Sequence, residues 1–416
     1  MTRFKQLFLK SNYRRLFLAS FASQLGTVIS TTSFTFYFLD HDASRPYYAS
    51  LTQMMYTLPS LTVFLFSGSV ADTFNRQKIA LYSDRINSAL CILLLLSTIW
   101  QHTVLIFFFL FLITASSKFF QPAQIGLIQG ILSHEEYAVA GGFNQMLSSL
   151  FLMFGTALGA FIYWMLGITG SITLNGISFL VSASLISHCK FKNQTVLPHG
   201  DRHPSPLNWN VLLTQFRQGF LYSARHPVLR YLMLGAFILG IVNGGLAIMP
   251  VYLLKYQLAP STYQQTASVA GIIFGLGILI GSFVASWLSE RMKLYQLMIA
   301  GFFLASLAIT LIACTTQMSF FFLFYFITAF SIPIVGVPFF GWLPQIVAPK
   351  FMGRVQALLD PIENQAQLLF FILLSCTFPN AISVTTPFIW FGGCLLAVGL
   401  LYLVVLPKAQ TPSEQE

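Results

Sequence analysis

Charged residues are scarce in this chain. Only 8% of its 416 residues are charged, whereas 56% are hydrophobic. The mean hydropathy is +0.73. A soluble globular domain carries roughly 25% charged residues, so this shortage argues against an ordinary soluble protein. The composition instead predicts a polytopic membrane protein.

Cysteine is scarce as well, and its distribution argues against two classes of site. The five cysteines are scattered, mostly through apolar stretches, without a C-x-x-C spacing. We therefore expect small packing residues, with no disulfide framework and no metal site. A Walker sequence is also missing, so ATP is not the expected energy source. We expect no cofactor. The net charge of +10 forms no basic stripe, and nucleic acid is not an expected partner.

Long apolar runs are what the chain has in abundance. A transmembrane helix needs about 20 predominantly apolar residues. At this length the sequence predicts an all-α membrane protein with twelve transmembrane helices. The expected spans are 15–38, 48–70, 80–100, 103–124, 138–162, 168–190, 228–254, 264–288, 295–314, 319–342, 354–376 and 384–407.

A single long polar connection divides these spans into two groups. It predicts an N-terminal six-helix half at 1–190, a linker at 191–227 and a C-terminal six-helix half at 228–416. The linker begins rich in proline, and from Asn208 its apolar residues share one helical face. This pattern predicts an amphipathic helix, either on the inner leaflet or against the bundle.

The two halves share features at a nearly constant spacing. Gly68-Ser69 after the second span recurs as Gly281-Ser282 after the eighth, and Arg76 recurs as Arg291. Two parallel halves of this kind are typical of transporters built from internal repeats. Basic residues concentrate in alternate connections, and only Arg45 and Lys255 lie on the opposite side. This asymmetry predicts that both termini are cytoplasmic.

The turn after the second span carries a charged signature. Gly68 is followed four residues later by Asp72 and then by Arg76 and Lys78, with Thr73 directly after the aspartate. The stretch resembles the loop signature between the second and third helices of the major facilitator superfamily, although that family usually places a basic residue where Thr73 stands. The segments 119–125 and 353–355 resemble its macrolide-efflux and enterobactin-exporter branch.

The resemblance implies a secondary active transporter that works by alternating access in the bacterial inner membrane, and not an enzyme. We expect a monomeric, proton-coupled exporter of a small amphipathic compound, either drug-like or siderophore-like. A lysophospholipid flippase and another metabolite transporter of this fold remain alternatives. A remote alternative from a different class is an intramembrane hydrolase that uses Asp360 and Glu363 as an acid pair.

Carboxylates inside a membrane are costly, and this makes them candidates for function. Asp360 and Glu363 lie deepest, on one helical face, with Pro361 between them. They are the proton-coupling candidates, although Asp360 can also reach the inner surface and pair with Arg354. Asp84 lies one turn into the third span, beside Arg85.

Uncharged polar residues and one lysine within the spans are the candidates for a substrate cavity. Lys118 is either a counter-ion to Glu363 or a lysine whose ammonium reaches the surface. The amides are either substrate contacts or hydrogen-bonding links between helices. The full candidate set is Gln24, Gln53, Lys118, Asn144, Gln145, Asn175 and Asn243.

A conformational latch is expected at the charged turn. Asp72 can meet the positive N-terminal end of the eleventh span near Arg354, because a helix N-terminus favours a carboxylate. The predicted latch consists of Gly68, Asp72, Arg76, Lys78 and Arg354.

Overall fold

The computed structural model describes residues 7–42, 45–197, 220–347 and 349–407, and for some helical positions it describes the backbone alone. These residues are almost entirely helical, and no strand occurs among them. The chain divides into two compact units, Met1–Asn208 and Trp209–Glu416. The predicted amphipathic helix from Asn208 falls largely outside the described residues. The predicted half and linker boundaries stay predictions.

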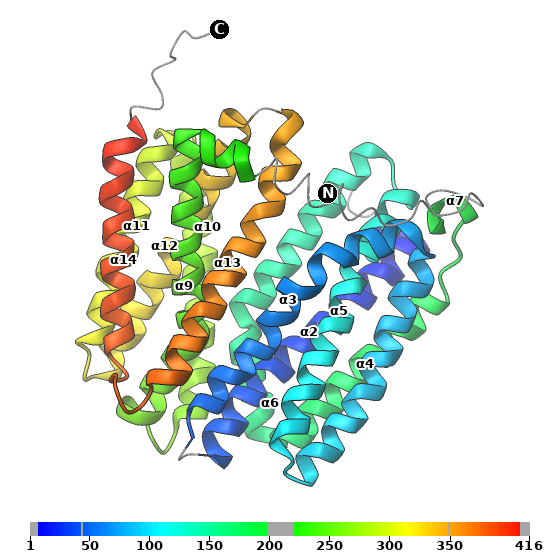
Figure 1. Ribbon diagram of the computed structural model, residues 1–416, viewed down its shortest axis with the longest axis horizontal. Helices are drawn as coiled ribbons and strands as arrows, with labels where there is room; N and C mark the ends of the chain where they lie inside the picture. The colour runs from blue at the N-terminus through cyan, green and yellow to red at the C-terminus, as the bar shows by residue number, and fades with distance from the viewer. Residues whose placement is uncertain (1–6, 43–44, 198–219, 348, 408–416) are drawn as a thin grey trace, which may run out of the picture. The chain divides into compact units, whose positions relative to one another are not determined.

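The N-terminal unit is a bundle of long helices (Figure 1). They are α2 (Ser11–His41), α3 (Tyr47–Thr73), α4 (Arg76–Ile99), α5 (Thr103–Ile131) and α6 (His134–Ser187), followed by the short α7 (Asn193–Val196). α6 is interrupted at Gly167, where φ is 64°. A positive φ is readily adopted by glycine, which lacks a Cβ. Gly167 therefore separates two helices, and the unit contains six long ones.

The C-terminal unit contains six more long helices. They are α9 (Pro227–Leu253), extended by the π-helical turn η1 (Leu254–Leu258), α10 (Tyr263–Ser289), α11 (Leu294–Ala313), α12 (Met318–Ile346), α13 (Pro349–Thr377) and α14 (Thr386–Val405). Among the described residues, eight segments are both long and apolar enough to cross a membrane. α2, α3, the first part of α6 and α13 are long enough as well. The prediction of an all-α membrane fold is confirmed, and the twelve-helix count agrees with it.

Several helix contacts depend on glycine. Gly26 of α2 lies against Asn175 and Ser178 of α6, and a Cβ at position 26 would collide with the Ser178 hydroxyl. In the C-terminal unit, a Cβ at Gly281 of α10 would collide with the backbone carbonyl of Phe330 on α12. Small residues let membrane helices approach closely, because lipid supplies no hydrophobic force between them.

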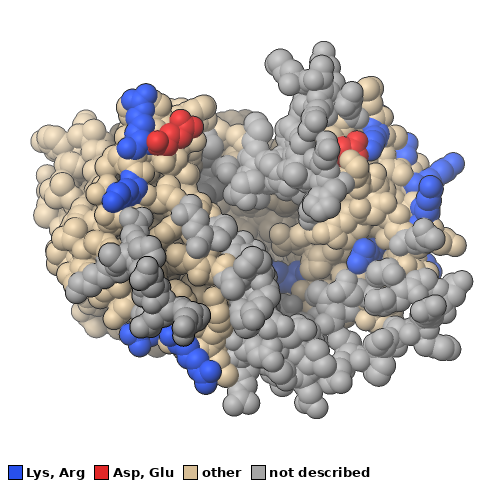
Figure 2. All heavy atoms as spheres, turned by 90° about the horizontal axis from the view of Figure 1, so that it is seen from above, with Lys and Arg blue, Asp and Glu red and all other residues tan. Residues whose placement is uncertain are grey.

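Polar contacts tie the helix ends of the N-terminal unit together. The Gln77 amide nitrogen of α4 donates to the carbonyls of Ile186 and Cys189 at the end of α6, at 3.0 and 2.9 Å. The Lys10 ammonium lies 2.7 Å from Glu136 in the first turn of α6. Figure 2 looks onto this end of the bundle and shows Lys and Arg side chains on it. Basic side chains are therefore present at this end of the molecule.

Gly281→Ala is expected to destabilise the C-terminal unit, since the Phe330 carbonyl is backbone and cannot rotate away. Overpacking of this kind costs about 1–3 kcal/mol. Thermal unfolding of the purified protein measures the effect. The matched control is Gly393→Ala on α14, where nothing lies within 4 Å of an added Cβ. Equal melting temperatures for the two variants would contradict the proposed close contact.

The Lys10–Glu136 pair is expected to make stability depend on acid pH. The hydrogen bond from Lys10, with help from the Ser133 backbone, lowers the pKa of Glu136 from its ordinary value of 4.5 to about 2. Because the pKa of Glu136 is lower in the folded state, the ionised carboxylate stabilises the fold at pH values above 4.5. This stabilisation is lost as the pH falls from 4.5 toward 2. Lys10→Gln should therefore lose less stability over this range than the unmodified chain.

The measurement for this pair is the melting temperature across that pH range at low salt. Exposed ion pairs are screened by salt, so the difference should shrink when salt is added. Lys293→Gln, at an exposed lysine of the other unit, is the control. A Lys10→Gln profile that parallels the unmodified one at every pH would rule out this linkage.

Candidate functional site

The C-terminal unit encloses an apolar cavity of about 220 Å³. Side chains from α9, α11, α12, α13 and α14 line it, among them Phe302, Ile309 and Val335. Among the described side chains that line it, four are polar, namely Asn243, Thr328, Ser331 and Glu363. Binding pockets commonly combine an apolar wall with a few polar groups that orient the ligand. This cavity is therefore the candidate site of the C-terminal unit.

Glu363 is the single ionisable group among the described residues of that cavity lining. Gly240 of α9 fixes its position, because a Cβ there would lie 2.5 Å from the Glu363 carbonyl oxygen. The close approach of α9 to α13 turns the half-buried Glu363 side chain toward the cavity. Among the described residues, no hydrogen bond or ion pair is made by its carboxylate. An unpaired carboxylate on an apolar wall is suited to gaining and losing a proton.

Asp360 differs from Glu363, although the two share a helix. Its side chain is exposed and does not line the cavity. The structure therefore separates the two carboxylates that the sequence placed on one face. The expectation that both lie deep fits Glu363 better than Asp360.

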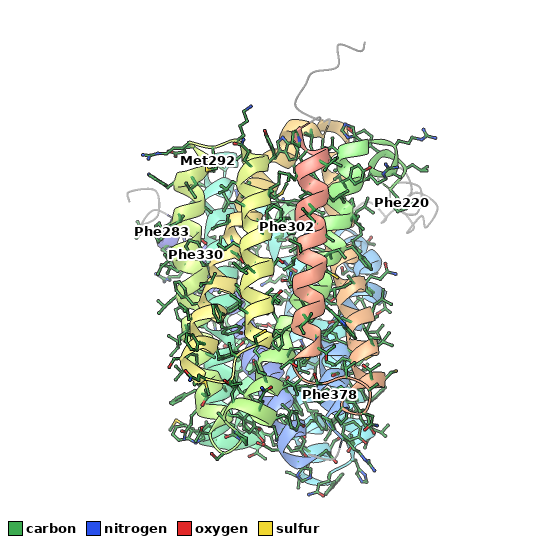
Figure 3. The ribbon with its side chains drawn as sticks, turned by 90° about the vertical axis from the view of Figure 1, so that its left-hand side faces the viewer. Phe220, Phe283, Met292, Phe302, Phe330 and Phe378 are labelled. Carbon is green, nitrogen blue, oxygen red and sulfur yellow. The ribbon has the colours of Figure 1, made fainter. Side chains whose placement is uncertain are left out.

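An aromatic pair supports the cavity wall. The Phe302 ring of α11 meets the Tyr402 ring of α14 edge-on, with centroids 5.3 Å apart. The Tyr402 hydroxyl donates to the Tyr231 carbonyl of α9 at 3.1 Å. Figure 3 shows Phe302 among the closely set helices of this unit. These two contacts join α9, α11 and α14 behind the side chains that line the cavity.

The N-terminal unit holds a second pocket of a different character, with a volume of about 380 Å³. Most of the described residues that line it, from α2, α3 and α5, carry a polar group. Gln24 and Lys118, two of the predicted cavity residues, line it, and the Gln24 amide donates to Ser20 at 2.8 Å. This pocket offers hydrogen-bonding groups and one positive charge, whereas the C-terminal cavity offers apolar surface and one carboxylate.

The remaining cavity candidates divide between the two expected roles. Asn243 lines the C-terminal cavity. Gln53 donates to the Thr35 hydroxyl at 3.0 Å, which links α3 to α2, and it lies in neither pocket. Asn175 is buried against Gly26. The side chains of Asn144 and Gln145 lie outside the described part of the structure.

The charged turn is only partly described. The Arg76 guanidinium donates to the carbonyls of Ala71 and Gly126, both at 3.2 Å, and so joins the ends of α3, α4 and α5. Asn75 caps α4 by accepting from the backbone nitrogen of Lys78, whose side chain is exposed. At Gly68, Asp72 and Arg354 the structure describes the backbone alone, so the latch stays a prediction.

Sequence reasoning missed part of the N-terminal pocket. Gln121 and Gln124 of α5 line it beside Lys118, together with Tyr56 of α3. A signal was present in the chain, because Thr114, Lys118, Gln121 and Gln124 recur at helical spacing within an apolar run.

Comparison with known proteins identifies the family. The profile of the Major Facilitator Superfamily matches residues 16–369. The chain belongs to this superfamily. It is 38% identical to the MFS-type transporter YkuC of Bacillus subtilis (strain 168) over 97% of this chain and 94% of that protein. It is 20% identical to macrolide efflux protein A of Streptococcus pyogenes, over 94% and 96% of the two chains.

Solved structures agree with this membership at the level of the fold. A POT family transporter in complex with 5-aminolevulinic acid superposes with a TM-score of 0.73 at 15% identity, covering 95% of this chain and 96% of that one. A mutant of the nucleoside transporter NupG superposes with a TM-score of 0.70 at 12% identity, covering 94% and 98%. The superfamily member described here is therefore a multi-pass membrane transporter of small molecules.

Filling the cavity should weaken ligand binding by this transporter. Ala305 of α11 lines the cavity, and Ala305→Phe places a ring inside it. We expect at least tenfold weaker binding of an amphipathic dye, rhodamine 6G, measured by fluorescence polarisation in nanodiscs. Leu307→Phe, on the same helix at a residue that is 61% exposed, is the control. Weakening by both variants, or by neither, would show that the cavity does not bind the dye.

Proposed function

We propose that this transporter exports a small amphipathic compound and is driven by proton entry through Glu363. The observation that carries the proposal is the placement of Glu363 on an apolar cavity wall, where it is the single ionisable group among the described lining residues. The export direction is supported by the likeness to macrolide efflux protein A.

The proposed coupling of proton movement to transport depends on the energetic cost of an ionised carboxylate in an apolar environment. A carboxylate is stable there as the neutral acid when the cavity is dry, and as the ion when water enters. Alternating access exposes such a cavity to the two sides of the membrane in turn. Glu363 would then take a proton on one side and release it on the other, and substrate movement would be tied to that cycle.

The character of the C-terminal cavity supports an amphipathic substrate. Its apolar walls suit an apolar body, and the polar side chains of Asn243, Thr328, Ser331 and Glu363 suit a polar group. A panel of erythromycin, a catecholate siderophore and a lysophospholipid covers the drug, siderophore and flippase alternatives.

The orientation proposed for the chain places both termini in the cytoplasm of a bacterial cell. Arg15 and Lys190 lie at the end of the N-terminal unit where α2 begins and α6 ends. The Arg15 guanidinium donates to the His188 carbonyl, and the Asn12 amide donates to the Lys190 carbonyl. Inner loops of bacterial membrane proteins are enriched in Lys and Arg. Labelling of single cysteines introduced at this end, in intact cells and in inverted vesicles, tests this orientation.

Glu363→Gln should abolish concentrative transport while preserving binding. Glutamine keeps the size and the hydrogen-bonding groups of the neutral acid but does not titrate. We expect pH-gradient-driven uptake of erythromycin into inverted vesicles to fall to the level of empty vesicles. Counterflow exchange at equal pH, which needs no net proton movement, should remain near normal.

Asp360→Asn is the matched control, because Asp360 lies one turn away on the same helix and outside the cavity lining. It should retain most gradient-driven uptake. Full accumulation by Glu363→Gln would place the coupling proton elsewhere. Loss of both uptake and exchange would instead assign Glu363 to substrate binding.

A further inference from the structure

A second buried carboxylate lies in the N-terminal unit. Asp84 of α4 is 0% exposed. Neither of its carboxylate oxygens has a hydrogen-bond partner. A carboxylate removed from water in this way must be neutralised or paired to be stable. The question is what supplies the neutralising charge.

Three helices surround this carboxylate with further oxygen atoms. The hydroxyls of Ser182 on α6 and Ser23 on α2 lie beside it without reaching hydrogen-bond geometry. The register of α2 and α6 accounts for this, because Gly26 contacts Ser178, and Ser23 and Ser182 lie about one turn away from that contact in each helix. Asp84 therefore lies where α2, α4 and α6 meet.

The cluster contains more hydrogen-bond acceptors than donors. Besides the Asp84 carboxylate, the Asn87 side-chain carbonyl is buried without a partner, and so is the Ser182 hydroxyl, which can donate as well as accept. Asn87 uses its amide nitrogen to donate to Ser117 at 2.9 Å, which leaves its carbonyl oxygen available. Unpartnered oxygen atoms around one negative charge suit a small cation, which oxygen ligands bind well.

No described protein cation neutralises Asp84. On α4, the exposed Arg85 lies 6.0 Å from the Tyr82 ring, and Arg76 donates to backbone carbonyls of α3 and α5. On α5, Lys118 lines the N-terminal pocket. On α2, Arg15 donates to the His188 carbonyl at the end of the bundle.

The other ionisable groups on these helices are neutral or distant from the cluster. α6 has no acidic or basic residue between Phe154 and Ser187. Its Tyr163 donates to Asp40 of α2 near the opposite end of the bundle, 3.1 Å away. Tyr56 of α3 lines the pocket, and Cys91 of α4 lies two turns beyond Asp84. Among the described residues, none is shown to pair with the Asp84 carboxylate.

We propose that Asp84 forms a binding site for one small monovalent cation, a proton or a sodium ion. Asp84 supplies the negative charge, and Asn87, Ser182 and Ser23 supply neutral oxygen atoms. A proton would bind a carboxylate oxygen and be donated to a neighbouring oxygen. A sodium ion would bind the oxygens directly. The site is separate from Glu363, lies in the other unit, and does not depend on the proposed export function.

Ser23 gives the cation a route to the site. It is 8% exposed and lines the N-terminal pocket, while its hydroxyl lies beside Asp84. A cation in the pocket thus reaches the carboxylate past one hydroxyl group. Occupancy of the site would respond to the contents of this pocket.

Infrared difference spectroscopy on the full chain in nanodiscs tests the site without a transport substrate. In sodium-free choline buffer, we expect the carbonyl stretching band of a protonated carboxylic acid that persists at neutral pH. Asp84→Asn should remove this band, and Glu363→Gln should leave it in place. Arg85→Gln, which changes the adjacent but outward-facing charge, is the control and should leave it unchanged.

Two further measurements identify the occupant. Loss of the Asp84 band when NaCl replaces choline chloride at constant pH indicates that sodium displaces the proton, and an unchanged band indicates a proton alone. Ser182→Ala keeps the charge and removes one oxygen, so it should shift the pH midpoint of the band or the sodium concentration that removes it. A role of Ser182 in packing alone would move neither.

Two negative results together would overturn the proposed cation site at Asp84. If no band is lost in Asp84→Asn at any pH, and sodium raises the melting temperature of neither the unmodified chain nor this variant, Asp84 binds no cation. Because asparagine mimics the neutralised state, Asp84→Asn should melt at or above the temperature of the unmodified chain. The transport result for Glu363→Gln does not change the infrared or melting result for Asp84→Asn. Each proposal can therefore be rejected without rejecting the other.

Discussion

The need to hydrogen-bond every backbone group away from water constrains this protein more than any single contact. Lipid offers no partner for an exposed N–H or C=O group, so each crossing must satisfy its own backbone as a helix. The long helices of both units follow from this requirement. Even the break in α6 is made at Gly167, where a backbone turn is accessible without steric cost.

Once the backbone is satisfied, the contacts between helices decide how the side chains are presented. The hydrophobic effect does not press helices together in lipid, so close approach depends on small residues and on polar links. Gly240 brings α9 onto the backbone of α13, and Gly26 brings α2 onto α6. Each contact also orients a polar residue, Glu363 in the first case and Asn175 in the second.

The two units apply the same architecture to different chemistry. The C-terminal unit surrounds one carboxylate with an apolar wall, whereas the N-terminal unit has a polar pocket with Asp84 buried behind Ser23. In each case a carboxylate lies where charge is costly, so its protonation or ligation responds to the entry of water or ions. This dependence is the physical basis on which a transporter can link cation movement to conformational change.

The sequence by itself determined the membrane class, the number of spans and the family, because hydropathy and the charged turn at Gly68–Lys78 are local properties of the chain. It also identified Glu363, Gln24, Lys118 and Asn243 as polar residues within spans. It did not separate Glu363 from Asp360, which share a helical face, and it placed Asp84 beside the cation Arg85. Only the tertiary structure decided that Arg85 faces outward, that Asp84 has no partner and that Gln53 links two helices. The physical reason is that the rotation of each helix about its axis is set by contacts with residues distant in sequence, such as Gly240 with Glu363, and no local pattern encodes those contacts.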